Sequence, residues 1–435
     1  MRYIAGLAGV LLGTMAWGQG TTQRALFLGN SYTGVNNLPQ MVADAAASAG
    51  DNLVFDSNTP GGQTLQAHST NATSLAKIAL GNWDYVVLQE QSQLPSFPLG
   101  QVQTDVFPYA QLLNGLILEA NPCAETVFYM TWGRENGDAG NCASWPPVCT
   151  YNGMDSLLNL RYRMMAEDND AMLSPVGAVW HYIRENHPTI DLYQADESHP
   201  SVAGTYAAAC CFYAALFRKD PTAITYTAGL PAADAAIIRA SAKWVVFDNL
   251  LEWNIGAFDP VAEFTAAPAN GNQVAFFNAS AYATDFLWNF GDGATSQEMS
   301  PLHAYAAPGS YVVELIASQC GRSDTSVATI DAAMSVDIAP PASPPSSTSS
   351  SSFSIYPNPA QDVLHVQPTG SPHAAHRWTY ALLGPTGQVI RSGTWGASDS
   401  PWDVSALPPG IYVVQWSADG EPQSPQRFVK TGGLR

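Results

Sequence analysis

Two short segments far apart in the chain hold the side chains best suited to chemistry. Ser31 lies in LGNSYT, directly after an apolar run at 25–29, and His199 lies in DESHP together with Asp196. A serine hydroxyl is a weak nucleophile near neutral pH and needs a base to take its proton. The imidazole of His199 can act as that base, and Asp196 can orient it and stabilise its protonated form. The three residue types predict nucleophilic acyl transfer.

Each segment taken alone also has a purely structural interpretation. Ser31 could cap the first turn of a helix, where hydroxyls accept hydrogen bonds from free N–H groups. Asp196 could cap a surface turn that Pro200 closes. The choice between the interpretations depends on whether the fold brings the two segments together.

The elements around these segments predict an α/β domain over residues 19–255. Strands separated by helices form parallel sheets, and such sheets bind ligands at the carboxyl ends of their strands. Ser31 follows the first predicted strand and therefore belongs at that edge. Helix dipole and free N–H groups there would favour negative charge beside the hydroxyl. The apolar runs are 25–29, 85–89, 126–132 and 171–176, and the helix-like stretches are 38–49, 101–120, 154–168, 202–217 and 233–253.

Taken together and in this order, the two segments resemble the SGNH/GDSL hydrolase superfamily over roughly residues 23–220. The segment GGQTL, whose second glycine is Gly62, resembles the glycine block of that family. The resemblance implies a doubly wound parallel sheet with Ser31 as nucleophile, His199 as base and Asp196 as its orienting partner. It also implies that the N–H groups of Ser31 and Gly62 line the oxyanion hole.

One part of the family pattern is missing. The family usually takes a third oxyanion donor from an Asn in a GxND block, whereas residues 84–92 read DYVVLQEQS. A glutamine amide can donate the same bond, and sialate-type acetylesterases of the superfamily resemble this chain in having a Gln-containing block. Gln89 is the first choice for the donor and Gln91 is the alternative.

Other side chains near the predicted site have two interpretations each. His68 follows the glycine block and could reach substrate or lie on the surface. Arg134, in TWGRENG, could bind a substrate carboxylate or sugar hydroxyl, or form a structural ion pair. Trp132, Trp145 and Trp180 could stack on a sugar or fill the core.

Composition and the amino terminus point to an exported protein. The chain has 435 residues, a formal net charge of −19 and 12% charged residues. This acidity argues against nucleic-acid or anionic-membrane partners, which require a basic surface. Residues 1–18 carry Arg2 before an apolar run and small residues, the layout of a signal peptide. No later segment is apolar for about 18 residues, so no membrane span is predicted.

The remainder of the chain predicts two small β-sandwich modules. Residues 260–335 contain WNFGDG and PGSYVVELIAS, in a series that resembles a PKD domain. Residues 336–352 are a Pro/Ser-rich linker. Residues 353–435 open with FSIYPNPA and contain LPPGIYVV, which resembles the C-terminal sorting domain of the type IX secretion system of Bacteroidota. That resemblance implies export by the type IX machinery. A plain β-sandwich binding module is the alternative.

Export permits disulfides, and one pair of cysteines is suggested by spacing. Cys142 and Cys149 bracket a short Trp/Pro loop, whereas Cys210 and Cys211 are adjacent in an apolar helical stretch that favours buried free thiols. Five cysteines precede residue 260 and one follows it, so a free thiol remains on each side unless a bridge crosses domains. CxxC and HExxH motifs are absent from the sequence, so we expect no metal or other cofactor.

These observations predict a serine esterase that is secreted or attached to the cell surface and hydrolyses small acyl esters. The favoured substrate is an O-acetyl group on a carbohydrate. One alternative is a lipase or thioesterase that acts on longer acyl chains. Another is a non-catalytic surface protein that binds glycans through a degenerate SGNH fold.

Overall fold

The computed structural model describes residues 20–269 and 272–332, and residues 352–430 apart from short stretches. Those stretches are residues 357–359, 361, 370–377, 385–388, 397–400, 409 and 419–420. The chain divides into two compact units, Met1–Val336 and Asp337–Arg435. The predicted signal peptide and nearly all of the Pro/Ser linker lie outside the described residues.

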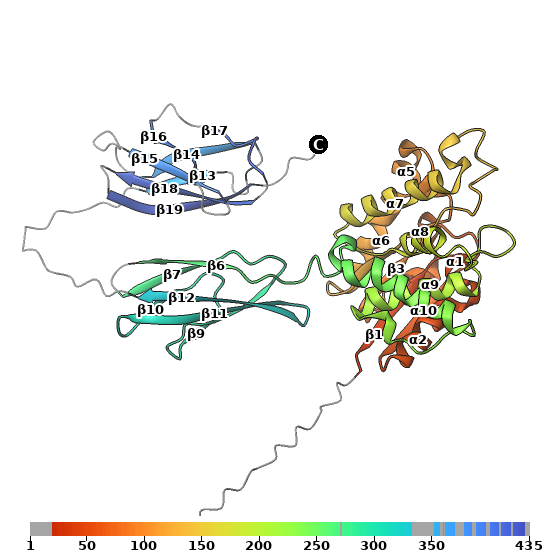
Figure 1. The fold of residues 1–435 in the computed structure, drawn as a ribbon. Coiled ribbons are helices and arrows are strands. Elements are labelled where there is room, and N and C mark those ends of the chain that lie inside the picture. The colour runs from red at the N-terminus through yellow and green to blue at the C-terminus, as the bar shows by residue number, and fades with distance from the viewer. Residues whose placement is uncertain are drawn as a thin grey trace, which may run out of the picture. The chain divides into compact units, whose positions relative to one another are not determined.

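The amino-terminal domain is built on a five-stranded parallel sheet with the order β2-β1-β3-β4-β5 (Figure 1). Successive connections run in opposite directions from β1, so a topological switch point lies between the neighbouring strands β1 and β3. Ligands of such sheets bind at this crevice. The strands are β1 (Thr22–Leu28), β2 (Asn52–Asn58), β3 (Tyr85–Leu88), β4 (Glu125–Tyr129) and β5 (Met172–Ser174).

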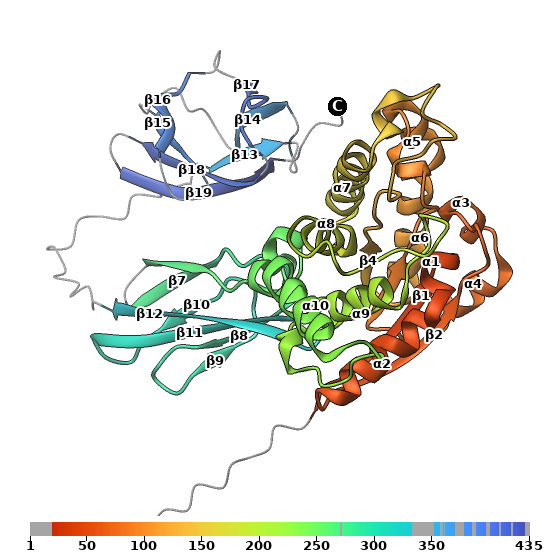
Figure 2. The same ribbon diagram turned by 45° about the vertical axis from the view of Figure 1, so that its right-hand side comes forward.

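Helices cover both faces of this sheet (Figure 2). One layer contains α2, α8, α9 and α10, which contact one another, and the other contains α4, α6 and α7. The predicted doubly wound α/β fold is therefore confirmed. The helices are α1 (Ser31–Gly34), α2 (Leu38–Ser48), α3 (Leu65–His68), α4 (Ala72–Ile78), α5 (Leu99–Asp105), α6 (Phe107–Ala120), α7 (Tyr151–Asp168), α8 (Val176–Asn186), α9 (Val202–Phe217) and α10 (Ala232–Val245). Short 3₁₀ helices are η1 (Val35–Asn37), η2 (Leu94–Ser96), η3 (Pro146–Cys149), η4 (Pro221–Ala223) and η5 (Phe247–Trp253).

Burial explains why the central strands read as continuous apolar runs. All residues of β3 and the last four of β1 are buried, as expected for parallel strands with a helix layer on each face. Parallel pairing aligns Leu28 with Leu88. This register sets the segment after β1, which begins the LGNS turn, beside Gln89 at the end of β3.

The second module of the first unit contains two antiparallel sheets, with the orders β10-β7-β6 and β12-β11-β8-β9. Its core includes Phe276, Trp288, Phe290 and Tyr305. Trp288 and Phe290 both point inward, because alternate residues of a strand face the same side. The strands are β6 (Phe264–Pro268), β7 (Gln273–Asn278), β8 (Asp285–Asn289), β9 (Thr295–Ser296), β10 (Leu302–Ala304), β11 (Gly309–Gln319) and β12 (Arg322–Ala332).

The described part of the second unit also forms two antiparallel sheets, β13-β14-β17 and β16-β15-β18-β19. Its core includes Trp378, Trp402, Tyr412 and Trp416. The β-sandwich class predicted for both modules is confirmed. The strands are β13 (Ser352–Tyr356), β14 (Val363–Thr369), β15 (Trp378–Leu383), β16 (Val389–Thr394), β17 (Trp402–Asp403), β18 (Gly410–Ala418) and β19 (Glu421–Lys430).

Candidate active site

The fold brings Ser31 and His199 into direct contact although they lie 168 positions apart. Ser31 is the first residue of α1, and its Oγ lies 2.8 Å from His199 Nε2. His199 Nδ1 lies 2.5 Å from Asp196 Oδ2. Each neutral imidazole nitrogen has one role, so a proton on Nδ1 facing the carboxylate leaves Nε2 free to accept the serine proton. This order of groups is the one that general-base activation of a serine requires.

The turn that carries Asp196 and His199 is held by its own carboxylate. Asp196 Oδ1 accepts the N–H groups of Ser198 at 3.1 Å and His199 at 2.9 Å. Glu197 adopts φ of 61°, in the left-handed region, and so closes the turn tightly. Burial by itself would raise the pKa of Asp196, but the hydrogen bonds from His199 and Ser198 outweigh it and lower the pKa. Asp196 is therefore an anion at neutral pH, able to stabilise an imidazolium.

Asn30 is a buried residue that shapes the turn before the nucleophile. Its side-chain oxygen accepts the N–H of Tyr32 at 3.0 Å and caps α1. Its Nδ2 donates to the carbonyl of Gln63 at 2.9 Å, which ties the glycine block to the nucleophile turn. No sequence pattern indicated this role of Asn30. Its bridging role depends on a contact across 33 positions.

The N–H groups of Ser31 and Gly62 are the predicted donors of the oxyanion hole. The N–H of Ser31 begins α1, and Gly62, with φ of 68°, lies in an exposed turn held at Gln63 by Asn30. Within the described residues, neither N–H has an assigned hydrogen-bond partner. Free N–H groups near a helix start attract negative charge. The oxyanion roles of Ser31 and Gly62 stay predictions.

Gln89 does not have the orientation predicted for it. It is fully buried, and its Oε1 accepts the N–H of Asn30 and the hydroxyl of Thr33, both at 2.9 Å. Its Nε2 donates to the carbonyl of Glu90 at 2.5 Å. The oxygen end of the amide holds the nucleophile turn, because that turn buries donors that need an acceptor, and the nitrogen end bonds the carbonyl of the next residue in the chain. In this geometry Gln89 positions the nucleophile segment and does not serve as an oxyanion donor.

Gln91, the alternative donor, lies in the loop after β3 and is partly exposed. Its Nε2 contacts Ser92 Oγ at 3.3 Å and Gln93 Oε1 at 3.0 Å, while its Oε1 accepts two loop N–H groups. The side chain of Gln91 is thus less buried than that of Gln89. Its oxyanion role stays a prediction.

His68 also lies in a position that differs from the prediction. It is completely buried, with Nδ1 2.7 Å from Ser74 Oγ and Nε2 2.9 Å from the carbonyl of Gly29. Burial lowers its pKa, partly offset by the bond to Gly29. Both ring nitrogens are used inside the protein, so His68 supports the strand end before the nucleophile and does not reach substrate.

Arg134 and the three tryptophans mostly follow their structural interpretations. Arg134 pairs with the buried Asp138 at 3.3 Å, with 30% of its side chain exposed. Trp132 and Trp180 are fully buried and stacked, with ring centroids 3.7 Å apart. Trp145 is partly buried and donates to the carbonyl of Ser96. Trp132 and Trp180 are therefore core residues and not a wall exposed to sugar. A substrate contact of Arg134 stays a prediction.

Glu90 is a buried carboxyl group that the sequence did not indicate. Both carboxyl oxygens lie 3.2 Å from the N–H of Leu65, and one accepts the N–H of Gln91. Burial raises its pKa to about 8, against the lowering effect of the Gln91 and Leu65 N–H groups. Asn30 and Glu90 thus hold the segment that follows Gly62, at Gln63 and at Leu65. In the described part of the chain, no cluster of three or more His, Cys, Asp or Glu side chains is suited to a metal ion.

Family models match both carboxy-terminal modules. Residues 258–334 match a model described as a PKD domain. The middle module is a PKD domain. Residues 354–431 match a secretion system C-terminal sorting domain. The type IX sorting domain predicted from the YPNPA opening is thereby confirmed, and it marks the chain for export. Among the described residues, no helix combines the length and apolarity needed to cross a membrane.

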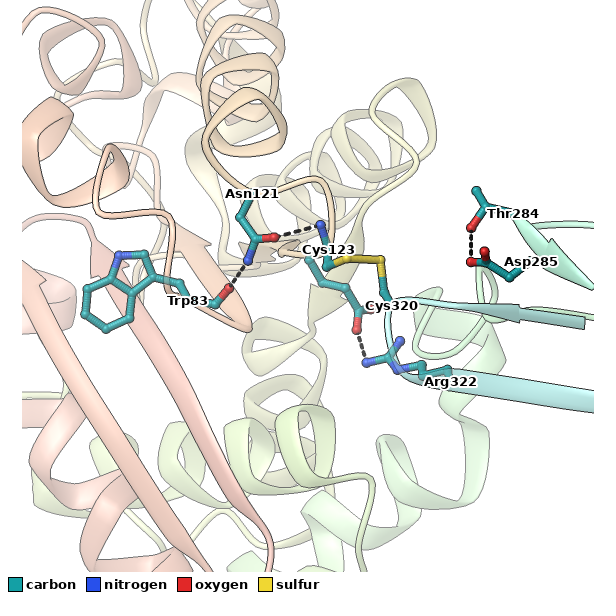
Figure 3. Close-up of a disulfide and its surroundings, with 8 residues drawn as sticks. Trp83, Asn121, Cys123, Thr284, Asp285, Cys320 and Arg322 are labelled. Atoms are coloured by element: carbon teal, nitrogen blue, oxygen red, sulfur yellow. Dashed lines mark hydrogen bonds and ion pairs between the residues drawn. A yellow bond between two sulfur atoms is a disulfide. The ribbon is translucent and has the colours of Figure 1, made fainter.

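The PKD domain is covalently attached to the α/β domain by a disulfide between Cys123 and Cys320 (Figure 3). Asn121 holds the loop on the α/β side, because its amide bonds the N–H of Cys123 and the carbonyl of Trp83, each at 3.0 Å. Arg322, at the start of β12, pairs with Glu125 at the start of β4. The bridge that crosses domains explains why Cys123 and Cys320 are not free thiols.

The remaining cysteines follow the predictions. Cys142 and Cys149 form a disulfide, and Cys210 and Cys211 are buried free thiols in α9. Burial raises the pKa of Cys210 to about 12, so this thiol is neutral. The pKa of Cys211 is raised in the same direction for the same reason.

Solved structures similar to the chain include two proteins that cover the α/β domain. A DUF4886 family protein from Bacteroides uniformis is 17% identical, with a TM-score of 0.44, and the match covers 53% of this chain and 95% of that structure. A protein from Slackia heliotrinireducens, provisionally described as an SGNH hydrolase, is 28% identical, with a TM-score of 0.36, and the match covers 44% of this chain and 97% of that structure.

One curated protein has a short similar segment. Collagenase ColA of Bacillus cereus is 60% identical over 30 residues, which are 7% of this chain and 3% of the collagenase. The chain therefore spans only a small fraction of that relative's length.

Proposed function

We propose that the protein is an exported serine esterase that hydrolyses small acyl esters through an acyl-enzyme on Ser31. The observation that carries the proposal is the contact of 2.8 Å between Ser31 Oγ and His199 Nε2, continued to Asp196. A serine that only caps a helix needs no imidazole at its hydroxyl. The second site segment supplies one, oriented by an anionic carboxylate.

The chemistry follows from this geometry in two steps. His199 Nε2 takes the Ser31 proton as Oγ bonds to the ester carbonyl carbon, and the carbonyl oxygen becomes an oxyanion facing the N–H groups of Ser31 and Gly62. The carbon–oxygen bond to the alcohol then breaks, and the imidazolium returns the proton to that alcohol. In the second step His199 takes a proton from water as the water oxygen bonds to the acyl carbon. The bond from that carbon to Ser31 Oγ then breaks, the imidazolium returns the proton to Oγ, and the carboxylic acid leaves.

Packing around the triad supports a small acyl group. The space next to Ser31 is filled by Tyr32, 3% exposed, which stacks on the fully buried Trp132. A cavity of about 720 Å³ is lined by residues such as Asp84 and Arg322, at the junction with the PKD domain, and Ser31, Gly62 and His199 do not line it. An acetyl group needs no deep channel, whereas a long acyl chain must bury many methylenes to bind.

Exposure of the triad supports an ester carried by a larger molecule. His199 and Asp196 have 31% and 48% of their side chains exposed. An open site of this kind admits a short acyl group that projects from a polymer. Together with export, this favours a carbohydrate O-acetyl ester outside the cell as substrate. The protein would act as a secreted enzyme or remain attached to the cell surface after sorting.

The proposal is tested by hydrolysis of p-nitrophenyl acetate by wild type, Ser31→Ala and the control Ser156→Ala. Ser156 is on α7, and its hydroxyl bonds only the helix carbonyl of Asn152 in the described structure. We expect Ser31→Ala to lose at least about 10³-fold in kcat/KM, whereas Ser156→Ala keeps wild-type activity. If Ser31→Ala retains wild-type turnover, the proposed mechanism is wrong.

Two further measurements define the substrate. Rates on p-nitrophenyl esters from acetyl to decanoyl should be highest for acetyl, and a maximum at long chains would support a lipase or thioesterase. Release of acetate from acetylated polysaccharides tests the carbohydrate substrate. If a phosphonate inhibitor fails to label Ser31 while polysaccharide binds, the non-catalytic alternative is correct.

A further inference from the structure

A second, buried hydrogen bond joins the two site segments, in addition to the one between Ser31 and His199. Tyr32 Oη lies 2.6 Å from Ser198 Oγ, across 166 positions of sequence. Both residues are buried, with 3% exposure for Tyr32 and 9% for Ser198. Tyr32 directly follows the nucleophile, and Ser198 directly precedes the base. The Tyr32–Ser198 bond is therefore a buried counterpart of the contact between Ser31 and His199.

Aromatic packing fixes both ends of this link. Trp132 stacks on Tyr32 with ring centroids 4.8 Å apart and an interplanar angle of 1°. The Nε1 of Trp132 donates to the carbonyl of Ser198 at 3.1 Å. Ser198 is thus held at its hydroxyl, at its carbonyl and, through Asp196, at its N–H. The peptide plane that leads into His199 has little freedom left.

The ring of Tyr32 also touches the base itself. Its centroid lies 5.4 Å from that of His199, at an interplanar angle of 71°, an edge-to-face contact. Such contacts are directional, because the ring edge is positive and the face is negative. Burial is the main cause that raises the pKa of Tyr32, against smaller lowering effects of Ser198, Ser92 and Arg134. The phenol therefore stays neutral, and its hydrogen bond is present throughout the working pH range of an esterase.

We propose that Tyr32 and Ser198 are a positioning pair that sets the approach of His199 to Ser31. This inference rests on the proposed esterase function. The two hydroxyls are buried and bonded to each other, and the contact between Ser31 and His199 is made by other atoms. Their effect on the reaction comes through the placement of the neighbouring residues. Displacement of a catalytic group by about 1 Å can cost about 10²-fold in rate, since proton transfer needs close alignment.

The chain offers a matched control for this pair. Tyr129 is fully buried, packs against the same Trp132 with ring centroids 6.3 Å apart, and has a hydroxyl without a hydrogen-bond partner in the described structure. Tyr129→Phe and Tyr32→Phe each remove one buried hydroxyl from one aromatic cluster. Only the Tyr32 hydroxyl is bonded to Ser198.

The experiment compares kcat and KM on p-nitrophenyl acetate for Tyr32→Phe, Ser198→Ala, the double variant and Tyr129→Phe. We expect kcat to fall about 10- to 100-fold in the first two, with KM changed less than about twofold, because the ester-binding groups stay in place. The double variant should be no slower than the slower single variant, since both lose the same bond. Tyr129→Phe should keep wild-type kcat.

A kcat for Tyr32→Phe and Ser198→Ala equal to that of Tyr129→Phe overturns the inference. A multiplicative loss in the double variant overturns it as well, because the two hydroxyls would then act separately. Thermal unfolding identifies a variant that does not fold, in which case the other single variant decides. Ser31→Ala separates the two failures: if it stays active, the esterase proposal is wrong, and if it is inactive while Tyr32→Phe is normal, only the positioning role is wrong.

Discussion

The two ends of the parallel sheet are held together in different ways. At the carboxyl end, single hydrogen bonds connect the site segments, such as the contact of Ser31 with His199. At the amino end, where β4 begins, a disulfide and ion pairs attach the PKD domain. Arg218 and Arg322 each pair with both Glu125 and Asp259. Several interactions thus hold the amino end, so that losing one leaves the others in place. The contact of Ser31 with His199 is a single hydrogen bond.

At the carboxyl end the geometry would serve the proposed reaction, whereas at the amino end it attaches one domain to another. Removing one atom at the site misaligns a proton transfer but removes little buried area, so the rate should change more than stability. Removing one charge at the junction leaves the other three charges and the disulfide in place. Single substitutions there should change the free energy of unfolding only slightly, and only loss of the disulfide should lower it strongly.

The largest expected effect is on activity, in Asp196→Asn. The amide cannot stabilise the imidazolium and can favour the wrong imidazole tautomer, so kcat should fall about 10²- to 10⁴-fold at neutral pH. Asp191→Asn is the matched control, because Asp191 caps a nearby turn by accepting the N–H of Tyr193 at 3.0 Å. Steady-state kinetics on p-nitrophenyl acetate measure both. Equal activity of the two variants would remove Asp196 from the mechanism.

The next effect is on stability, when Cys123 and Cys320 are both changed to Ser. Their disulfide spans 197 positions, and closing a loop of that length is worth on the order of 5 kcal/mol in the chain-entropy model. We expect a lower unfolding temperature and a separate transition for the PKD domain in calorimetry, with kcat unchanged. The unchanged kcat is expected because the bond lies at the sheet end away from Ser31.

The short disulfide provides the comparison for that experiment. Cys142 and Cys149 are separated by 7 positions, so their double Ser variant should lose only about 2–3 kcal/mol in the same model. A smaller loss for the Cys123/Cys320 variant than for the Cys142/Cys149 variant would show that the junction is held mainly by its charges. A fall in kcat of the Cys123/Cys320 variant would show that the two sheet ends are coupled.

Sequence patterns predicted what is encoded locally. Buried apolar runs predicted the parallel strands, and the strand followed by GNS predicted a serine at the sheet edge. The pairing of Ser31 with His199 could be expected only through a family resemblance, because no local pattern relates positions 168 apart.

The sequence did not predict the orientation of individual side chains. Gln89 and His68 have the right chemistry for a site, but buried donors and acceptors of the nucleophile turn use them first. The disulfide between Cys123 and Cys320 depends on how two domains pack against each other. The spacing of the cysteines in the sequence does not predict that packing. Glu90 gave no sequence signal, since a carboxylate in QEQS reads as an exposed loop residue.

The last prediction concerns the pH dependence of stability and rests on the buried carboxyl group of Glu90. Its pKa is raised from 4.5 to about 8, so the folded state binds the proton more tightly than the unfolded state. The stabilisation is complete below pH 4.5 and is lost as pH rises through about 8. Glu90→Gln stays neutral and should lose less stability on the alkaline side. Between pH 5 and 9 the difference in unfolding free energy should shift in favour of the variant by on the order of 4 kcal/mol.

Denaturant unfolding at a series of pH values measures this difference directly. Glu119→Gln on α6, an exposed carboxylate, is the control for the change of a Glu to Gln. Because other titrating groups are common to all the chains, subtraction removes them. A Glu90→Gln difference that is constant with pH would mean that the carboxyl group already ionises freely in the folded protein. The segment that carries Gly62 would then be held by an anion and not by a neutral acid, and the carboxyl end of the sheet would depend on charge as the amino end does.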